Sequence, residues 1–499
     1  MFFTSIKSGW ISFLVILLSE VPCIAQATDS DRYELTLDDR AVYESPKVAA
    51  LGKDGVLIYH KVRDKAKDFL EVIKIDTTLT ENWRGGIPIE KNLIVSKVET
   101  QDHIVYALLH SAGYGGYDFQ VIAMDVRTQN YNTYVVKNLI PLKPTDFKIS
   151  SNGLLIGGYF NDIPVVLHFN IITGRSRLLP GFFNDVGVLN QIKVYGNGLI
   201  DIIVSTKNIQ RKKVLWLRTY SSEGDLINTT ILQDENKNLI FGRSLRKPDG
   251  TQIVAGNFAL RNSDYSKGVF ITEIDPDGVY TLRYHNFSDF ENYFKYMKPS
   301  REARVKERIE RRKLKGKKIR YTYLFQTHEL HQYGDEYLLL GETFYPRYYY
   351  LNSFGYYNRG DRIFDGYRYT HALIVGFDQD GELVWDNTFE MNDVKTFDII
   401  QYVKLAPRGE QLGLLYLYEN EVRSKTINQN QVLKEKSKQP LKLKYDSDNV
   451  KEKKTVTSFL EYWYSPYFLA WGIQEVSHSN TGNDFSDRTV LFINKIKYP

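Results

Sequence analysis

A polar turn followed by an apolar run recurs along the chain at a nearly constant spacing. The clearest copies are GKDGVLIYH at 52–60, SSNGLLIGGYF at 150–160, YGNGLIDIIVS at 195–205 and KPDGTQIVAGNF at 247–258. Turn-forming residues before an aliphatic, β-branched or aromatic run indicate the start of a buried strand. A unit that repeats every 20–50 residues or so is typical of a solenoid, a propeller or another array.

Weaker copies of the same turn extend the repeat to the end of the chain. All the turns centre on Gly55, Asp102, Gly153, Gly198, Gly250, Gly334, Gly409 and Pro466. The successive steps are therefore 47, 51, 45, 52, 84, 75 and 57 residues. The two longest steps contain segments that break the pattern, at 292–320 and 343–371, and we interpret both as insertions.

A second apolar run follows each of these strands, and two such runs end in an Asp-x-Asp-Gly turn, at 275–278 and 378–381. Asp and Gly tolerate the positive φ angles of tight hairpin turns. A calcium-binding EF-hand loop would also need a Glu at its twelfth position, and neither turn has one. The two motifs therefore predict hairpin turns.

A unit of about 50 residues with several short strands, repeated about eight times, resembles the four-stranded blade of the β-propeller superfamily. The resemblance covers nearly all of 28–499. It implies an all-β fold, a single β-propeller domain of about eight (seven to eight) four-stranded blades, with one inserted charged helix. It extends to no specific family, because Trp385-Asp386 is the only WD pair, and the kelch-like Gly157-Gly158 of one unit is not repeated in the other units.

The ends of such a ring must be joined to remove the open sheet edges. We expect residues 32–37 to pair with the last strand near 490–497 and so to close the ring. A pair of β-sandwiches is the alternative architecture, and the regular spacing of the turns disfavours it.

The first 27 residues have the features of a secretory signal peptide. Lys7 precedes an apolar stretch at 11–18 that is shorter than the roughly 20 residues of a membrane span. Small residues would allow cleavage after Ala25 or Ala27. Cys23 is the only cysteine, and the Glu-Val-Pro before it does not fit a lipoprotein signal.

Cleavage would leave a mature chain without cysteine, which excludes disulfides, thiolate catalysis and cysteine–metal sites. An exported protein without disulfides must rely on its own core, and about 470 residues can bury one. We therefore expect an exported bacterial protein in the periplasm or at the cell surface.

The formal charge of +5 is concentrated in one segment. Residues 301–320 hold eleven Lys or Arg against three Glu, so the rest of the chain is near −3. No Gly or Pro interrupts 301–315, which predicts a charged helix supported by i,i+4 ion pairs. Its cations could contact an anionic surface, or the helix could simply be a solvated excursion; the candidates are Arg301, Arg304, Arg308, Arg311, Arg312 and Lys315.

The insertion at 343–371 is dense in Tyr and Arg. Tyr offers a rigid contact area with a polar tip, and loops on a rigid scaffold often carry binding sites. The alternative is a loop that packs on itself. The candidate contact residues are Tyr345, Arg347, Tyr348, Tyr349, Tyr350, Tyr356, Tyr357, Arg359, Tyr367 and Tyr369.

No catalytic motif is present in the sequence. His328 and His331 are three apart on a predicted strand, which directs their rings to opposite faces. The sequence therefore predicts a non-enzymatic binding or scaffold module of the cell envelope that contacts a protein or glycan through the Tyr/Arg-rich insertion. We expect no cofactor, no metal and no nucleic acid, and a possible weak contact with an anionic membrane surface.

The alternative function is a carbohydrate-active propeller enzyme, a glycoside hydrolase or lyase with carboxylates at the channel mouth. Such carboxylates meet in space, so their sequence spacing does not reveal them. Carboxylates that converge at the mouth beside exposed aromatic rings would favour the enzyme. A filled centre with the aromatic rings displaced from it would favour the binding module.

Overall fold

A computed structural model of the chain describes residues 28–37, 46–63, 67–111, 118–181, 186–350, 362–445, 448–479 and 485–498. The predicted signal peptide at 1–27 lies outside them. Among the described residues, no helix combines the length and the apolar character that a membrane crossing requires.

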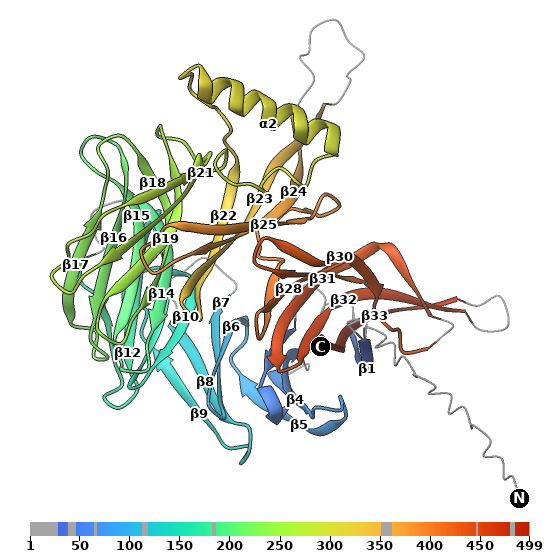
Figure 1. The fold of residues 1–499 in the computed structure, drawn as a ribbon. Coiled ribbons are helices and arrows are strands. Elements are labelled where there is room, and N and C mark those ends of the chain that lie inside the picture. The colour runs from blue at the N-terminus through green and yellow to red at the C-terminus, as the bar shows by residue number, and fades with distance from the viewer. Residues whose placement is uncertain are drawn as a thin grey trace, which may run out of the picture.

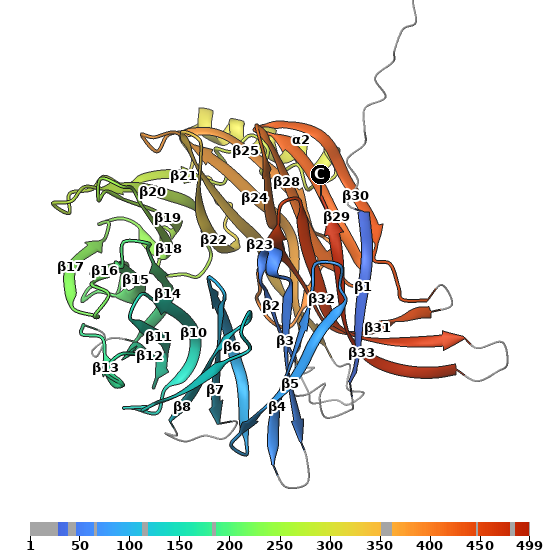
Figure 2. The same ribbon diagram turned by 90° about the horizontal axis from the view of Figure 1, so that it is seen from below.

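The chain forms eight antiparallel sheets that follow one another around a ring (Figures 1 and 2). This confirms the β-propeller and gives eight blades. Blade 1 contains β2 (Lys47–Ala50), a 3-10 turn η1 (Gly52–Asp54), β3 (Val56–Arg63), β4 (Asp68–Ile75) and β5 (Glu81–Ile89). Blade 2 contains β6 (Leu93–Gln101), β7 (Ile104–Ser111), β8 (Phe119–Asp125) and β9 (Tyr131–Val136). Blade 3 contains β10 (Lys143–Ser150), β11 (Gly153–Phe160), β12 (Ile163–Asn170) and β13 (Arg175–Leu178). Blade 4 contains β14 (Gly187–Val194), β15 (Ile200–Lys207), β16 (Lys213–Tyr220) and β17 (Leu226–Leu232).

The second half of the ring repeats this plan, with markedly longer strands in blades 6 and 8. Blade 5 contains β18 (Asn238–Arg246), β19 (Gln252–Ala259), β20 (Gly268–Ile274) and β21 (Arg283–Asn286), followed by helix α2 (Pro299–Leu314). Blade 6 contains β22 (Leu324–Tyr333), β23 (Glu336–Tyr350), β24 (Arg362–Phe377), β25 (Leu383–Glu390) and the short β26 (Lys395–Thr396), which pairs with β24. Blade 7 contains β27 (Lys404–Arg408), β28 (Gln411–Tyr418), β29 (Glu421–Asn428) and β30 (Gln431–Pro440). Blade 8 contains β31 (Asp448–Tyr464), β32 (Tyr467–Ser479) and β33 (Phe485–Lys497), with β1 (Thr28–Leu37) as its fourth strand.

The first strand of the chain closes the ring. β1 runs antiparallel to β33, with Arg32 opposite Asn494 and Leu37 opposite Thr489, which confirms the pairing expected from the sequence. The guanidinium of Arg32 donates to the side chains of Asn494 (3.0 Å) and Gln474 (2.6 Å). Blade 8 is joined to blade 1 by the indole of Trp463, which donates to the carbonyl of Gly55 (2.9 Å).

The recurring turn joins the first and second strands of each blade, so the apolar run after it is the second strand. In β15 and β19 nearly every residue is buried, because neighbouring blades cover both faces of these strands. The first strands, such as β10, carry half-exposed polar residues, and several outer strands, such as β17, are largely exposed. The sequence repeat therefore marks the two buried middle strands of each blade.

Both Asp-x-Asp-Gly motifs are hairpin turns, as predicted. Gly278 and Gly381 have φ angles of 84° and 77°, which favour glycine. The carboxylates of Asp275 and Asp378 accept the backbone N–H groups of residues 279 and 382, each at 2.8 Å.

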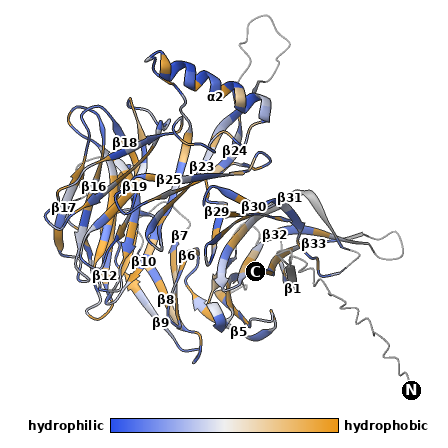
Figure 3. Ribbon diagram, in the orientation of Figure 1, coloured by the Kyte–Doolittle hydropathy of each residue, from blue (hydrophilic) through white to orange (hydrophobic). Residues whose placement is uncertain are grey.

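Helix α2 confirms the charged helix, which begins two residues earlier than expected, with Pro299 in its first turn. Only Ile309 is fully buried, and it packs with the half-buried Val305 against an aromatic cluster that includes Phe287 and Tyr293. The remaining helix surface is largely hydrophilic (Figure 3).

The Tyr/Arg-rich segment is not a loop over its described part. Residues 343–350 and 362–371 continue β23 and β24 as a long hairpin, because the two sides pair, for example Tyr345 with Arg368, with register shifts after Thr343 and after Pro346. We call residues 343–350 and 362–371 the arm. In Figure 1 the arm extends beyond the blade beside α2.

His371, at the base of the arm, gives a pH-dependent stability. It is fully buried, its ring stacks on Tyr296 at 4.1 Å between centroids, and burial lowers its pKa from 6.5 to about 3. Between these two pKa values the His371 side chain is protonated in the unfolded chain and neutral in the folded chain. The contribution of His371 to the free energy of unfolding is therefore complete above about pH 6.5 and falls as the pH drops towards 3.

We predict that replacing His371 by Gln removes the part of the pH dependence of stability that arises from protonation of this histidine in the unfolded chain. Between pH 7.5 and 5.0 the wild type should lose about 2 kcal/mol more stability than H371Q, measured by urea unfolding at both pH values. H103Q, which removes a solvent-accessible histidine, is the control. An equal loss in the wild type and H371Q would contradict the prediction.

Candidate functional site

The inner strands place charged side chains in contact across the centre of the ring. Lys148 on β10 lies 2.6 Å from Glu99 on β6. Glu329 on β22 lies 3.7 Å from Lys193 on β14 and 3.9 Å from Arg243 on β18. Since β14 and β22 belong to blades 4 and 6, Glu329 spans the inner end of blade 5. These three contacts join the inner strands by ion pairs that are partly exposed.

Two further charged residues, Lys404 and Glu461, lie on the inner strands of blades 7 and 8. Burial lowers the pKa of Lys404 on β27, while Glu461 on β31 opposes that shift. Burial raises the pKa of Glu461, and Lys404 opposes that shift in turn. Glu99 and Glu329 therefore each lie within ion-pair distance of a cation, and Glu461 interacts electrostatically with Lys404. This arrangement is unlike two carboxyl groups free to act on a glycosidic bond.

The arm is stiffened by a continuous series of aromatic rings that starts in the core. Successive ring centroids are 5.1–5.6 Å apart along the series Tyr402, Tyr369, Phe344, Tyr367, Phe364 and Tyr348. The guanidinium of Arg362 lies 3.7 Å from the centroid of the last ring, a cation–π contact. One side of the arm is therefore packed on itself.

The other side of the arm is open to solvent. Tyr345 and Tyr349 are 49% and 47% exposed, and Arg347 between them is exposed too. Alternate residues of a strand share a face, so these three side chains form one row. The Nε atom of Arg347 lies 3.5 Å from the carboxylate of Asp365.

The structure thus separates the sequence-predicted contact residues. Tyr345, Arg347 and Tyr349 are brought together in the exposed row. Tyr348 and Tyr367 belong to the packed side and are half-buried. Tyr369 is 1% exposed, which places it in the core and corrects its assignment to a contact surface. Outside the described part lie the side chain of Tyr350 and all of Tyr356, Tyr357 and Arg359.

Helix α2 exposes all six predicted cations, namely Arg301, Arg304, Arg308, Arg311, Arg312 and Lys315. Arg311 makes an i,i+4 contact with Glu307 at 3.5 Å. The segment before the helix is tied to the arm, because Tyr296 stacks on His371. The arm and helix α2 are therefore held on the same side of the molecule (Figure 1).

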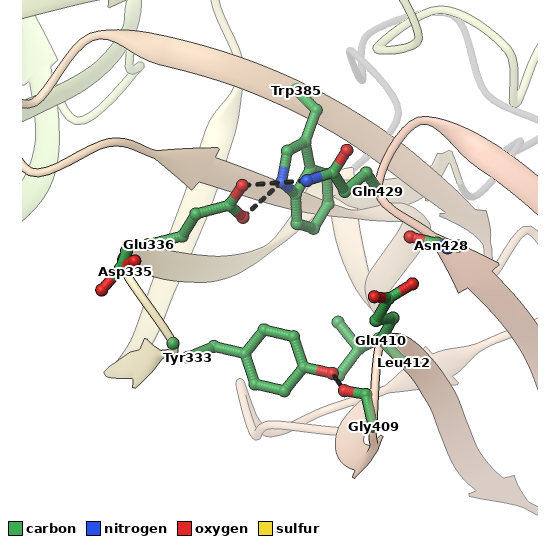
Figure 4. A pocket seen from close by; sticks show the side chains of 10 residues that line it. Tyr333, Asp335, Glu336, Trp385, Gly409, Glu410, Leu412, Asn428 and Gln429 are labelled. Carbon is green, nitrogen blue, oxygen red and sulfur yellow. Dashed lines mark hydrogen bonds between the residues drawn. The ribbon is translucent and has the colours of Figure 1, made fainter.

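A cavity of about 590 Å³ lies between blades 6 and 7, at a place that the sequence analysis did not identify. Glu336 is fixed there, because Trp385 Nε1 donates to one carboxylate oxygen (2.6 Å) and Gln429 Nε2 to the other (3.0 Å) (Figure 4). The hydroxyl of Tyr333 donates to the carbonyl of Gly409.

The cavity is acidic. Asp335 and Glu410 line it with Glu336, and no Lys or Arg is among the described residues that line it. Burial, Glu410 and Glu336 together raise the pKa of Tyr333, so the hydroxyl stays protonated. We call this cavity the acidic pocket.

A second cavity, of about 880 Å³, adjoins the acidic pocket, with Tyr333 lining both. It extends over blades 6, 7 and 8, and we call it the apolar groove. Its walls are mainly apolar or aromatic and include Leu338, Leu405, Pro407, Tyr462, Phe468 and Tyr498.

A signal for these cavities was present in the sequence repeat. Residues 332–336 and 407–411 are two weaker copies of the recurring turn, in which Tyr, Asp and Glu stand near the turn. Residues of the two turns line the acidic pocket. The weakness of these copies therefore coincides with the site.

No family model and no curated protein matches the chain. Solved structures resemble it in fold alone. The polysaccharide lyase Uly1 is 10% identical over 94% of this chain and 100% of its own, with a TM-score of 0.42. The β-propeller domain of the Trilobed protease from Pyrococcus furiosus is 9% identical over 80% and 98%, with a TM-score of 0.37. The Dos1 propeller is 9% identical over 79% and 88%, with a TM-score of 0.39.

The core placement of Tyr369 leads to a stability prediction. Its hydroxyl donates to the carbonyl of Ile400 (2.7 Å) and accepts from the N–H of the same residue (3.1 Å). Y369F leaves both backbone groups without this partner and should cost about 1–3 kcal/mol in urea unfolding. Y349F, at an exposed ring, should change stability by less than about 0.5 kcal/mol. Equal effects would place Tyr369 outside the core.

Proposed function

We propose that the protein is an exported binding or scaffold module of the cell envelope. Its contact surface is the row Tyr345, Arg347 and Tyr349 together with the cationic face of α2, which we call the arm–helix surface. The partner carries an anionic surface, on a protein or a glycan.

The main observation in favour of the proposal is that packed aromatic rings hold an exposed aromatic and cationic surface in a rigid position. The ring series from Tyr402 to Tyr348 holds the arm, and the stack of Tyr296 on His371 holds the helix segment against it. A rigid aromatic surface loses little conformational entropy on binding. Exposed Arg side chains add attraction to an anionic partner, and at low salt the same attraction extends to an anionic membrane surface.

The centre of the ring supports a binding module over an enzyme that acts at the channel. Glu99 and Glu329 are within ion-pair distance of cations, and the exposed aromatic row stands on the arm, away from the inner strands. The displacement of the aromatic rings from the centre is the arrangement expected of a binding module.

We predict that a photo-crosslinking residue at position 349 captures the partner in native cells. The same residue at position 209, where Ile209 is 98% exposed on the distant blade 4, is the matched control. Mass spectrometry of the adduct separates a protein, a glycan and a lipid partner.

Charge reversal on the helix tests its share of the surface. R304E combined with R308E and R311E should reduce the yield of the position-349 adduct by about tenfold or more, without a change in unfolding, since all three side chains are exposed. An adduct that forms equally from positions 349 and 209, or no adduct at all, would contradict the proposal.

One observation favours the second candidate, a carbohydrate-active enzyme. In the acidic pocket, Glu336 and Glu410 stand beside Trp385 and Tyr333, a combination of carboxylates and aromatic rings that suits a sugar. Incubation with neutral and acidic polysaccharides, followed by product chromatography, tests this function. Cleavage that is abolished in both E336Q and E410Q would establish the enzyme, and no cleavage by the wild type would reject it.

A further inference from the structure

The acidic pocket and the apolar groove are adjacent cavities, and we call the two together the cleft. Tyr333 lines both cavities, and so do residues of the turn between β27 and β28, with Arg408 in the groove and Gly409 in the pocket. Together they exceed the size of a single side chain. A ligand that fills both cavities therefore needs a charged part followed directly by an apolar part.

The acidic pocket fits a cationic side chain. Its three carboxylates, Asp335, Glu336 and Glu410, have no Lys or Arg beside them among the described lining residues. Glu336 is oriented by hydrogen bonds from Trp385 and Gln429, so it is held in place before a ligand arrives. An aromatic ring at such a site adds cation–π attraction for an ammonium or guanidinium group.

The apolar groove fits aliphatic or aromatic side chains. Leu405 and Pro407 of blade 7 and Phe468 of blade 8 are among the residues that line it, and Tyr462 at its wall is 57% exposed. On the blade 8 side the groove is also lined by the exposed Lys497. The two parts of the cleft therefore differ in charge.

An edge strand of blade 7 lines the groove. β27, which contributes residues 405–408 to the groove, pairs only with β28 among the described strands. A strand edge supplies N–H and C=O groups to an extended peptide. Neither an acyl chain nor a sugar would use these backbone groups in that way.

We propose that this cleft binds an extended segment of a partner protein. The segment carries Lys or Arg for the acidic pocket, then apolar residues for the groove, and then an acidic residue or a terminal carboxylate near Lys497. The arm–helix surface prefers the opposite charge, so the protein has two independent interfaces, and this inference does not rest on the proposed function.

An immobilised library of random octapeptides tests the cleft. The wild-type chain should retain peptides in which Lys or Arg precedes at least two apolar residues. E336Q and E410Q should each bind these peptides about tenfold more weakly, and the preference for a cation should disappear. Y462S should weaken binding through the apolar residues and leave the preference for a cation in place.

D277N makes the same charge change at an exposed turn of blade 5 and should bind as the wild type does. Thermal unfolding of each variant verifies that it is folded. The proposal is overturned if the wild type retains no peptide class, if retained peptides lack a cation, or if E336Q and E410Q bind as D277N does. Retention that fails only in the arm–helix variants would assign peptide binding to the other surface.

Discussion

The pairing of β1 with β33 is the contact on which the whole ring depends. Without it, blade 8 would expose the edge of β33, and the two ends of the chain would be free to separate. The pairing extends from Thr28 to Leu37, and the hydrogen bonds of Arg32 to Gln474 and Asn494 fix its register. Closure holds blade 8, which lines one side of the cleft, against blade 1.

Blade 6 then carries most of what departs from a plain propeller. Its strands β23 and β24 form the arm, Glu336 and Trp385 build the acidic pocket, and Glu329 crosses the centre. Its neighbours are attached to it through buried carboxylates. Asp386 accepts the N–H groups of Glu291 and Asn292 ahead of α2. Glu342, which is fully buried, accepts the N–H groups of Tyr402 and Val403 at the start of blade 7.

The sequence predicted the parts of this structure whose physical cause is local. A buried strand such as β19 needs an apolar run and a turn before it, so the repeat gave the blade count, and an uninterrupted charged stretch gave α2. The strands that line the centre were not predicted from the sequence. Asp146 and Lys148 on β10, for example, face a polar channel and interrupt the apolar pattern of a buried strand. The pattern also concealed the arm, since Tyr345 and Tyr369 look alike in sequence, yet one is exposed and the other is buried.

The cleft could not be predicted for a different reason: its walls come from three separate blades, 6, 7 and 8, and only the packing of these blades brings them together. The central claim is that blade 6 and its attachments form the binding side of the molecule. Hydrogen–deuterium exchange, with and without the native envelope fraction, tests it most directly. The account predicts slower exchange in β23, β24, α2 or β27, with blades 2 to 4 unchanged. Slower exchange confined to blades 2 to 4 would contradict it.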